Sequence, residues 1–119
     1  MVNKEIYGQP SFVLENELVS LAITKLGGHM APVVFGAAND RQICPYYISP
    51  WQDENHAAMP AEVLVPLRGD FFCLPFGGNA IRYQNQKHPV HGETATAEWT
   101  FVDSEEVESG ISIITSSPT

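Results

Sequence analysis

Glycine and proline are spread along the whole chain, and this distribution is the strongest constraint on its fold. The 119-residue sequence contains nine glycines and nine prolines, which divide its apolar residues into short segments. Short apolar segments bounded by turn residues are typical of β-strands, because helices need longer uninterrupted runs. The pattern predicts a mostly antiparallel all-β protein with about seven to nine short strands and little helix.

The length and the apolar content predict one folded domain. Apolar residues make up 44% of the chain and charged residues 17%, so a hydrophobic core is expected and disorder is not. No internal repeat or flexible linker divides the sequence. We therefore expect a single β domain over residues 1–119, either a sandwich or a barrel on this evidence.

The charge balance excludes several classes of partner. Six basic residues stand against 14 acidic ones, for a formal charge of −8, so no basic stripe is available to bind nucleic acid or an anionic membrane. The N-terminal segment lacks the apolar run of a secretory signal. Cys44 and Cys73 have no Cys-x-x-Cys spacing, so we expect two buried thiols in a cytoplasmic protein, with a disulfide between them as the alternative.

The alternation of apolar and polar residues predicts where the strands lie. Strands are expected over residues 17–24, 29–35, 62–67, 71–76, 96–102 and 110–115. For the first of these, a helix ending at Gly27-Gly28 is the competing interpretation, and its β-branched residues favour the strand. Residues 43–48 are expected to form an edge strand or an irregular extended piece, residues 51–61 a surface loop with at most one helical turn, and the acidic residues 103–108 a solvated hairpin tip.

The densest polar cluster lies between residues 68 and 93. Arg68 stands before a glycine at an expected strand end, where its guanidinium can bind vicinal hydroxyls or a carboxylate. The alternative is an intramolecular ion pair with Asp70 or Glu93. His91 lies in a loop that turns into a strand, a position suited to proton exchange or to metal binding. The alternative there is a histidine that only caps its own loop.

The spacing of His88, His91 and Glu93 also suggests a metal site. Imidazole and carboxylate groups on one short segment are common ligands of transition metals. In an extended chain, however, positions 88 and 91 point to opposite faces, so a turn at Pro89 is required. The predominant expectation is no metal and no cofactor, with a metal-binding β-barrel as the alternative.

Aromatic residues near this cluster provide candidate surfaces for a flat ligand. Trp51 lies in a polar loop and is expected to be an exposed stacking platform. The others are more simply explained as core residues: Phe71, Phe72, Phe76, Tyr83 and Trp99.

Several segments together resemble the galactose mutarotase-like superfamily, in its aldose 1-epimerase and hexose-6-phosphate 1-epimerase branches. They are Leu67-Arg68-Gly69-Asp70-Phe71-Phe72-Cys73-Leu74-Pro75-Phe76-Gly77, His91-Gly92, Trp99, Phe12-Val13-Leu14-Glu15-Asn16 and Gly27-Gly28-His29-Met30. The likeness covers residues 11–102. It implies part of an antiparallel β-supersandwich that binds a monosaccharide or related carbohydrate on its concave face.

The resemblance also implies roles for individual residues. His91 matches the family's first histidine, a catalytic group near the sugar ring oxygen, and Arg68 matches a substrate-positioning arginine. Asn79 matches the asparagine of an Asn-Arg-Ile segment, and Arg82 stands two positions out of register with its arginine. With Trp51, these form the expected carbohydrate site.

The resemblance leaves part of the family's machinery unmatched. The family's second histidine and its catalytic glutamate come from the later half of a longer chain, so we expect the N-terminal portion of a mutarotase-like protein, with carbohydrate recognition and incomplete epimerase activity. A cut supersandwich exposes strand edges, for example at residues 110–115, so a homodimer is also expected. A β interaction module without a small ligand remains an alternative.

Overall fold

A computed structural model describes residues 1–36, 38–75, 77–108 and 110–118, so Phe76 lies outside the described residues. The prediction of an all-β protein with antiparallel sheets is confirmed. The elements are β1 (Val2–Ile6), β2 (Gln9–Glu15), β3 (Val19–Thr24), β4 (Met30–Phe35), β5 (Thr100–Val107) and β6 (Gly110–Ser116), with two short 3-10 turns, η1 (His56–Ala58) and η2 (Glu62–Leu64).

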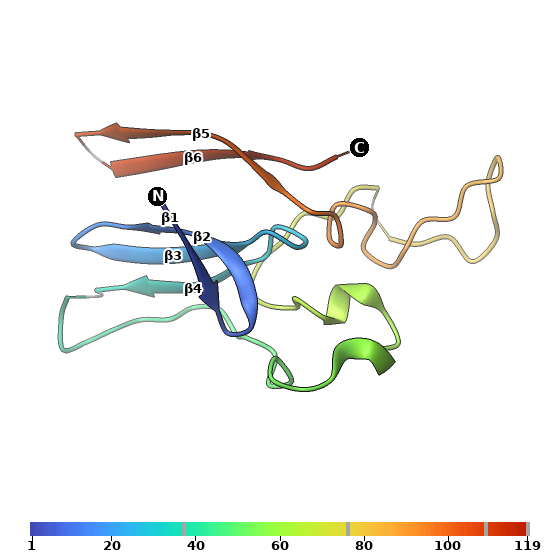
Figure 1. Ribbon diagram of the computed structural model, residues 1–119, viewed down its shortest axis with the longest axis horizontal. Helices are drawn as coiled ribbons and strands as arrows, with labels where there is room; N and C mark the ends of the chain where they lie inside the picture. The colour runs from blue at the N-terminus through green and yellow to red at the C-terminus, as the bar shows by residue number, and fades with distance from the viewer. Residues whose placement is uncertain (37, 76, 109, 119) are drawn as a thin grey trace.

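The strands form two antiparallel sheets that lie one above the other. Strands β1 to β4 form a meander in the order of the sequence, and β5 and β6 form a separate hairpin. Figure 1 shows this hairpin as a second layer along one side of the four-stranded sheet. Phe12 of β2 and Phe101 of β5 lie with their ring centres 6.3 Å apart, so aromatic contact links the layers in a sandwich-like arrangement.

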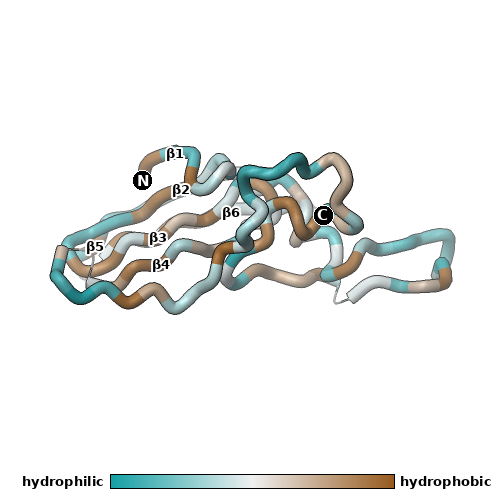
Figure 2. Tube along the Cα trace, turned by 90° about the horizontal axis from the view of Figure 1, so that it is seen from below, coloured by the Kyte–Doolittle hydropathy of each residue, from teal (hydrophilic) through white to brown (hydrophobic). Residues whose placement is uncertain are grey.

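The core is small and centred on β2. Figure 2 shows hydrophobic residues along β2, β3 and β4. In the described ranges, the buried apolar residues are Phe12, Val13, Leu14, Ala22, Ala31, Val33, Val63 and Ala95. An equal number of polar residues is buried with them, His29 and Arg68 among them. Because buried polar groups must be hydrogen-bonded, hydrogen bonds between polar residues help to fix how the core packs.

The middle of the chain is irregular, and two strand predictions there are wrong. Residues 62–67 begin with the 3-10 turn η2, and the described part of 71–76 contains no strand. The main-chain pairing described in this region consists of isolated bridges, such as Leu74 with Gly92 and Met30 with Asp70. An unbroken apolar run signals burial on both faces, yet Phe72 and Leu74 are 69% and 61% exposed. Consecutive apolar residues therefore did not indicate buried strands in this region.

The last hairpin is displaced from its predicted position. Strand β5 covers Thr100–Val107, so the acidic residues expected in a hairpin tip lie mostly within the strand. Of residues 96–99, Thr96 lies in a turn, in which its amide donates to the Glu93 carbonyl at 3.2 Å, and Glu98 forms only an isolated antiparallel bridge with Leu26. Every residue of β5 is exposed, so acidic side chains there stay in water. Strand β6, by contrast, lies where the sequence predicts it.

The Gly27-Gly28 turn connects the first sheet to the C-terminal part of the chain. The Gly27 amide donates to the Ala97 carbonyl, and the Trp99 amide donates to the Lys25 carbonyl, both at 2.7 Å. Gly28 has φ +63°, and a Cβ there would lie 2.7 Å from the Trp99 ring. Glycine is therefore required at this position both for its backbone conformation and for its lack of a side chain.

Replacement of Gly28 tests this connection. We expect Gly28→Ala to lower the free energy of unfolding by about 2–3 kcal/mol, because it adds a steric clash to backbone strain. Gly110→Ala is the matched control, since a Cβ there meets nothing within 4 Å, and its effect should stay within about 1 kcal/mol. Urea unfolding of both variants measures the difference, and equal losses would contradict the assigned role of Gly28.

Candidate functional site

The candidate site is built on a buried arginine. Arg68 is 1% exposed, and its guanidinium donates hydrogen bonds in several directions. Nε donates to the Pro66 carbonyl at 3.0 Å, Nη1 to the Ile6 carbonyl at 2.7 Å, and Nη2 to the Tyr7 carbonyl at 2.9 Å and to Gln52 Oε1 at 2.5 Å. Arg68 therefore ties the β1–β2 turn to the irregular segment after β4.

The sequence predicted that the Arg68 guanidinium binds a ligand or pairs with a carboxylate, but in the structure it bonds to main-chain carbonyls and to Gln52. Burial lowers its pKa from the ordinary value of arginine. In the described part of the chain, neither Asp70 nor Glu93 pairs with it, and Glu93 instead lies 3.2 Å from His88 Nδ1. The guanidinium faces main-chain carbonyls rather than a cavity, so direct binding of a ligand by Arg68 stays a prediction.

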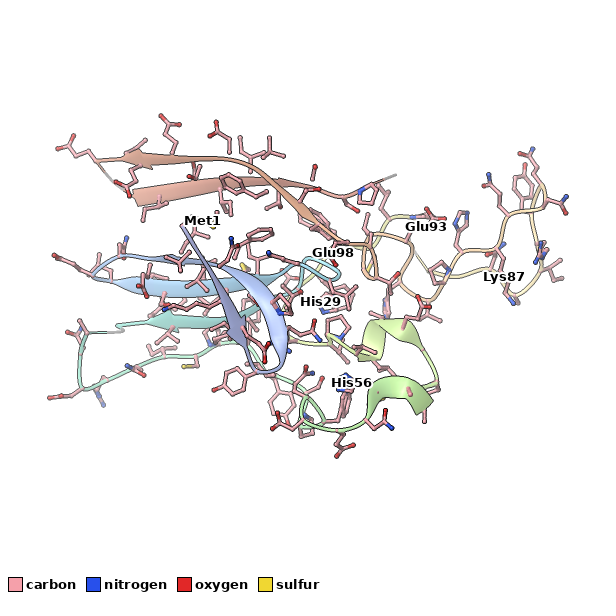
Figure 3. The ribbon with its side chains drawn as sticks, viewed as in Figure 1. Met1, His29, His56, Lys87, Glu93 and Glu98 are labelled. Atoms are coloured by element: carbon pink, nitrogen blue, oxygen red, sulfur yellow. The ribbon has the colours of Figure 1, made fainter. Side chains whose placement is uncertain are left out.

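His29 lies beside Arg68 and is fully buried. Its Nε2 is 3.0 Å from the Ala95 carbonyl, and the Arg68 amide donates to its Nδ1 at 3.4 Å. These partners require a neutral ring with the proton on Nε2. Burial lowers the His29 pKa from 6.5 to about 4, so the ring is neutral at physiological pH. Figure 3 shows His29 inside the molecule, between the first sheet and the loops.

Stacked aromatic rings connect this interior to the surface. The Phe71 ring stacks on His29 with centroids 4.2 Å apart and planes 11° apart. His91 meets Phe71 edge-on, with centroids 5.5 Å apart and planes 89° apart. The His91 side chain is exposed, and its Nδ1 lies 3.6 Å from Cys73 Sγ. The buried pair Arg68–His29 thus supports a pair formed by the exposed His91 and the partly accessible Cys73.

Local main-chain pairing explains why residues 73 and 91 meet. Leu74 forms an isolated parallel bridge with Gly92, and the Leu74 amide donates to Thr94 Oγ1 at 3.0 Å. The same hydroxyl donates to the Phe72 carbonyl at 2.8 Å. A Cβ at Gly92 would lie 2.2 Å from the Pro75 carbonyl oxygen, so only glycine allows this approach.

A groove opens beside Cys73, and we call it the Trp99 groove. It has a volume of about 640 Å³ and is lined by Phe72, Cys73, Leu74, Thr94, Trp99, Ile113, Ile114, Thr115 and Ser117. A smaller hollow of about 280 Å³ shares Phe72, Trp99 and Thr115 with it. The rings of Phe72 and Trp99 stack with centroids 5.9 Å apart, and Phe72 is largely exposed.

The remaining predicted site residues lie elsewhere. Asn79 organises its own loop, because its side-chain amide donates to the carbonyls of Ile81 and Gln86 and its Oδ1 accepts from the His88 amide. Arg82 is exposed on that loop, with Nη1 3.5 Å from the Asn85 carbonyl.

Trp51 belongs to a third region of the structure. It is half-buried, and its Nε1 donates to the Leu64 carbonyl at 2.7 Å, so its polar end is held within the protein. The side chain of His56, near the 3-10 turns in Figure 3, lies 2.9 Å from the Trp51 carbonyl. Trp51 lines neither the Trp99 groove nor the smaller hollow. The structure therefore does not gather the five predicted site residues into one site.

The alternative metal site does not form. Across the described ranges, no group of three or more His, Cys, Asp or Glu side chains is arranged to hold a metal ion. His88 lies against Glu93, whereas His91 lies against Cys73, so the proposed ligands separate into two pairs. Both cysteines are free, and the prediction of two buried thiols is wrong, since Cys44 is exposed and Cys73 is partly accessible.

Within the described residues, no helix is long and apolar enough to cross a membrane.

Comparison of the chain with protein-family models, with curated proteins and with solved structures found no match.

The buried His29 predicts a pH dependence of stability. Its pKa is lower in the folded than in the unfolded protein, so between pH 6.5 and about 4 only the unfolded state gains the proton. The stabilising contribution is complete above pH 6.5 and falls by about 3 kcal/mol as the pH drops to about 4. His29→Gln keeps a donor for the Ala95 carbonyl and removes this titration.

The measurement is the free energy of urea unfolding of both proteins at several pH values. The wild type should lose more stability than His29→Gln between pH 6.5 and 4. His88→Gln is the control, because His88 is partly exposed and should leave the wild-type slope in place. Parallel slopes for the wild type and His29→Gln would contradict a buried neutral His29.

Proposed function

We propose that this chain recognises a carbohydrate, with a monosaccharide ring seated in the Trp99 groove. The observation that carries the proposal is the stacked, solvent-accessible pair Phe72–Trp99 at the groove. The apolar face of a sugar ring packs well on an aromatic ring, and its hydroxyls need hydrogen-bond partners nearby. Thr115 and Ser117 line the same groove and carry hydroxyls, whereas the Thr94 hydroxyl is already bonded to the Phe72 carbonyl and the Leu74 amide.

The dimensions and polarity of the groove support the same proposal. Its volume of about 640 Å³ falls within the range of small-molecule sites. The lining combines aromatic and aliphatic side chains with a few hydroxyls, and its described residues include no carboxylate or basic side chain. A neutral sugar suits this lining better than a sugar phosphate, which would need cationic partners.

The resemblance to the mutarotase-like superfamily supports the substrate class. The segments that carry the resemblance include Phe72 and Trp99, which line the groove, and Arg68, which is buried. We accordingly propose a partial β-supersandwich of the aldose 1-epimerase type. In this arrangement Arg68 acts through the framework that it stabilises, and His91 stands beside the groove as the candidate proton-transfer group.

Replacement of Phe72 tests the binding surface. Phe72 is 69% exposed, so Phe72→Ala should keep the fold while it removes one stacking face. We expect about five- to tenfold weaker aldose binding. The matched control is Tyr83→Ala, which removes an equally exposed aromatic ring from the distant loop and should leave binding unchanged.

The measurement is saturation-transfer NMR against a panel of neutral aldoses, followed by titration with the one that binds best. Contact with none of the aldoses would overturn the proposal and favour a β interaction module without a small ligand. Equal losses in the two variants would contradict the groove as the binding surface.

A second measurement separates recognition from catalysis. Mutarotation needs an acid and a base at the sugar, and His91 lines neither the Trp99 groove nor the smaller hollow. We therefore expect that the chain binds an aldose without accelerating its mutarotation in polarimetry. Acceleration that His91→Asn abolishes would instead show a complete catalytic site.

A further inference from the structure

Cys73 and His91 form a thiol–imidazole pair at the margin of the Trp99 groove. Cys73 Sγ lies 3.6 Å from His91 Nδ1, and Cys73 is a partly accessible residue of the groove lining, so a base lies beside a cysteine that borders open space. Cysteine reactivity depends on removal of the thiol proton, which a neighbouring imidazole performs. From this geometry we propose that Cys73 is a nucleophile, activated by His91, that small neutral disulfides modify.

The orientation of His91 is held by the structure around it. Its ring lies edge-on against Phe71, which is stacked on the buried His29. Gly92 pairs with Leu74, and this pairing brings their chain neighbours His91 and Cys73 together. Because Nδ1 faces the sulfur, the neutral tautomer with its proton on Nε2 leaves Nδ1 to accept the thiol proton.

The reaction is a thiol–disulfide exchange. His91 Nδ1 accepts the Cys73 proton while Sγ attacks one sulfur of the small disulfide, and a new sulfur–sulfur bond forms. The original disulfide bond breaks, and its electron pair leaves on the second sulfur. That sulfur takes the proton from the imidazolium and departs as a thiol. Cys73 ends as a mixed disulfide, and the small disulfide supplies the oxidising equivalents.

The groove determines which reagents reach the sulfur. Phe72, Leu74 and Trp99 line it beside Cys73, and its polar residues are uncharged hydroxyls. The chain carries a formal charge of −8, which disfavours anionic reagents in general. A small, neutral disulfide is therefore the reagent class that fits. This inference does not rest on carbohydrate binding, since it uses only the thiol, its base and access to solvent.

Cys44 provides an internal control within the same molecule. Its side chain is exposed, whereas Cys73 is only partly accessible, so accessibility alone favours Cys44. In the described part of the chain, no histidine lies against Cys44 as His91 lies against Cys73. Exposure alone would make Cys44 react faster, so a faster reaction at Cys73 indicates that its thiol is activated.

The experiment treats the folded chain with bis(2-hydroxyethyl) disulfide at neutral pH and follows each cysteine by peptide mass spectrometry after an acid quench. We expect Cys73 to react about tenfold faster than Cys44 in the native protein, and the two rates to become similar in denaturant. A native rate at Cys73 equal to or below that at Cys44 would overturn the proposal, as would a preference that persists in denaturant.

Two variants identify the base. His91 has φ +67°, a conformation that asparagine tolerates, so His91→Asn keeps the loop and removes the base. The Cys73-to-Cys44 rate ratio should fall about tenfold in this variant. His88→Asn is the matched control, because His88 contacts Glu93 rather than a thiol, and it should leave the ratio unchanged. An unchanged ratio in a folded His91→Asn protein, checked by near-ultraviolet circular dichroism, would refute the role of His91.

Discussion

The hydrogen bonds of the buried Arg68 guanidinium are the interaction on which the irregular half of this protein depends. They hold the carbonyls of the β1–β2 turn and of Pro66, together with the side chain of Gln52. In the described part of this half, ladder hydrogen bonds are few, because its segments pair at isolated bridges rather than as strands. The guanidinium donates to several carbonyls at once, and this matters because a buried carbonyl without a hydrogen-bond donor is costly in free energy.

The same arginine positions the exposed chemistry through a series of direct contacts. Its amide bonds to His29, His29 supports Phe71, and Phe71 meets His91. Because His29 is neutral, it stacks on Phe71 without placing a second positive charge beside the guanidinium. The pair formed by Cys73 and His91, and the groove beside it, are consequently supported by the contacts that begin at the buried Arg68. Changes in that framework should reach the groove residues even where they touch no ligand.

Prediction from the sequence succeeded where one local rule decided the outcome. Alternation with β-branched residues located β3, and the Gly-Gly turn correctly preceded β4. Prediction failed at 62–67 and 71–75, because a run of apolar residues does not reveal whether a strand partner exists. It also failed at β5, where the acidic residues expected in a turn lie along an exposed strand. An acidic side chain reports exposure to water, and an exposed strand satisfies that requirement as well as a loop does.

The amino-acid sequence alone favours an all-β chain, since glycines and prolines divide much of it into short segments and β-branched residues favour a strand over a helix at residues 17–24. It also marks residues 68–93 as the segment richest in reactive side chains. The partners of those side chains are set by the three-dimensional packing. Arg68 binds main-chain carbonyls, and Cys73 meets His91 through the pairing of Leu74 with Gly92. Every residue type carries a main-chain carbonyl and almost every type an amide, so these contacts leave no signature in the sequence, and only the folded chain shows them.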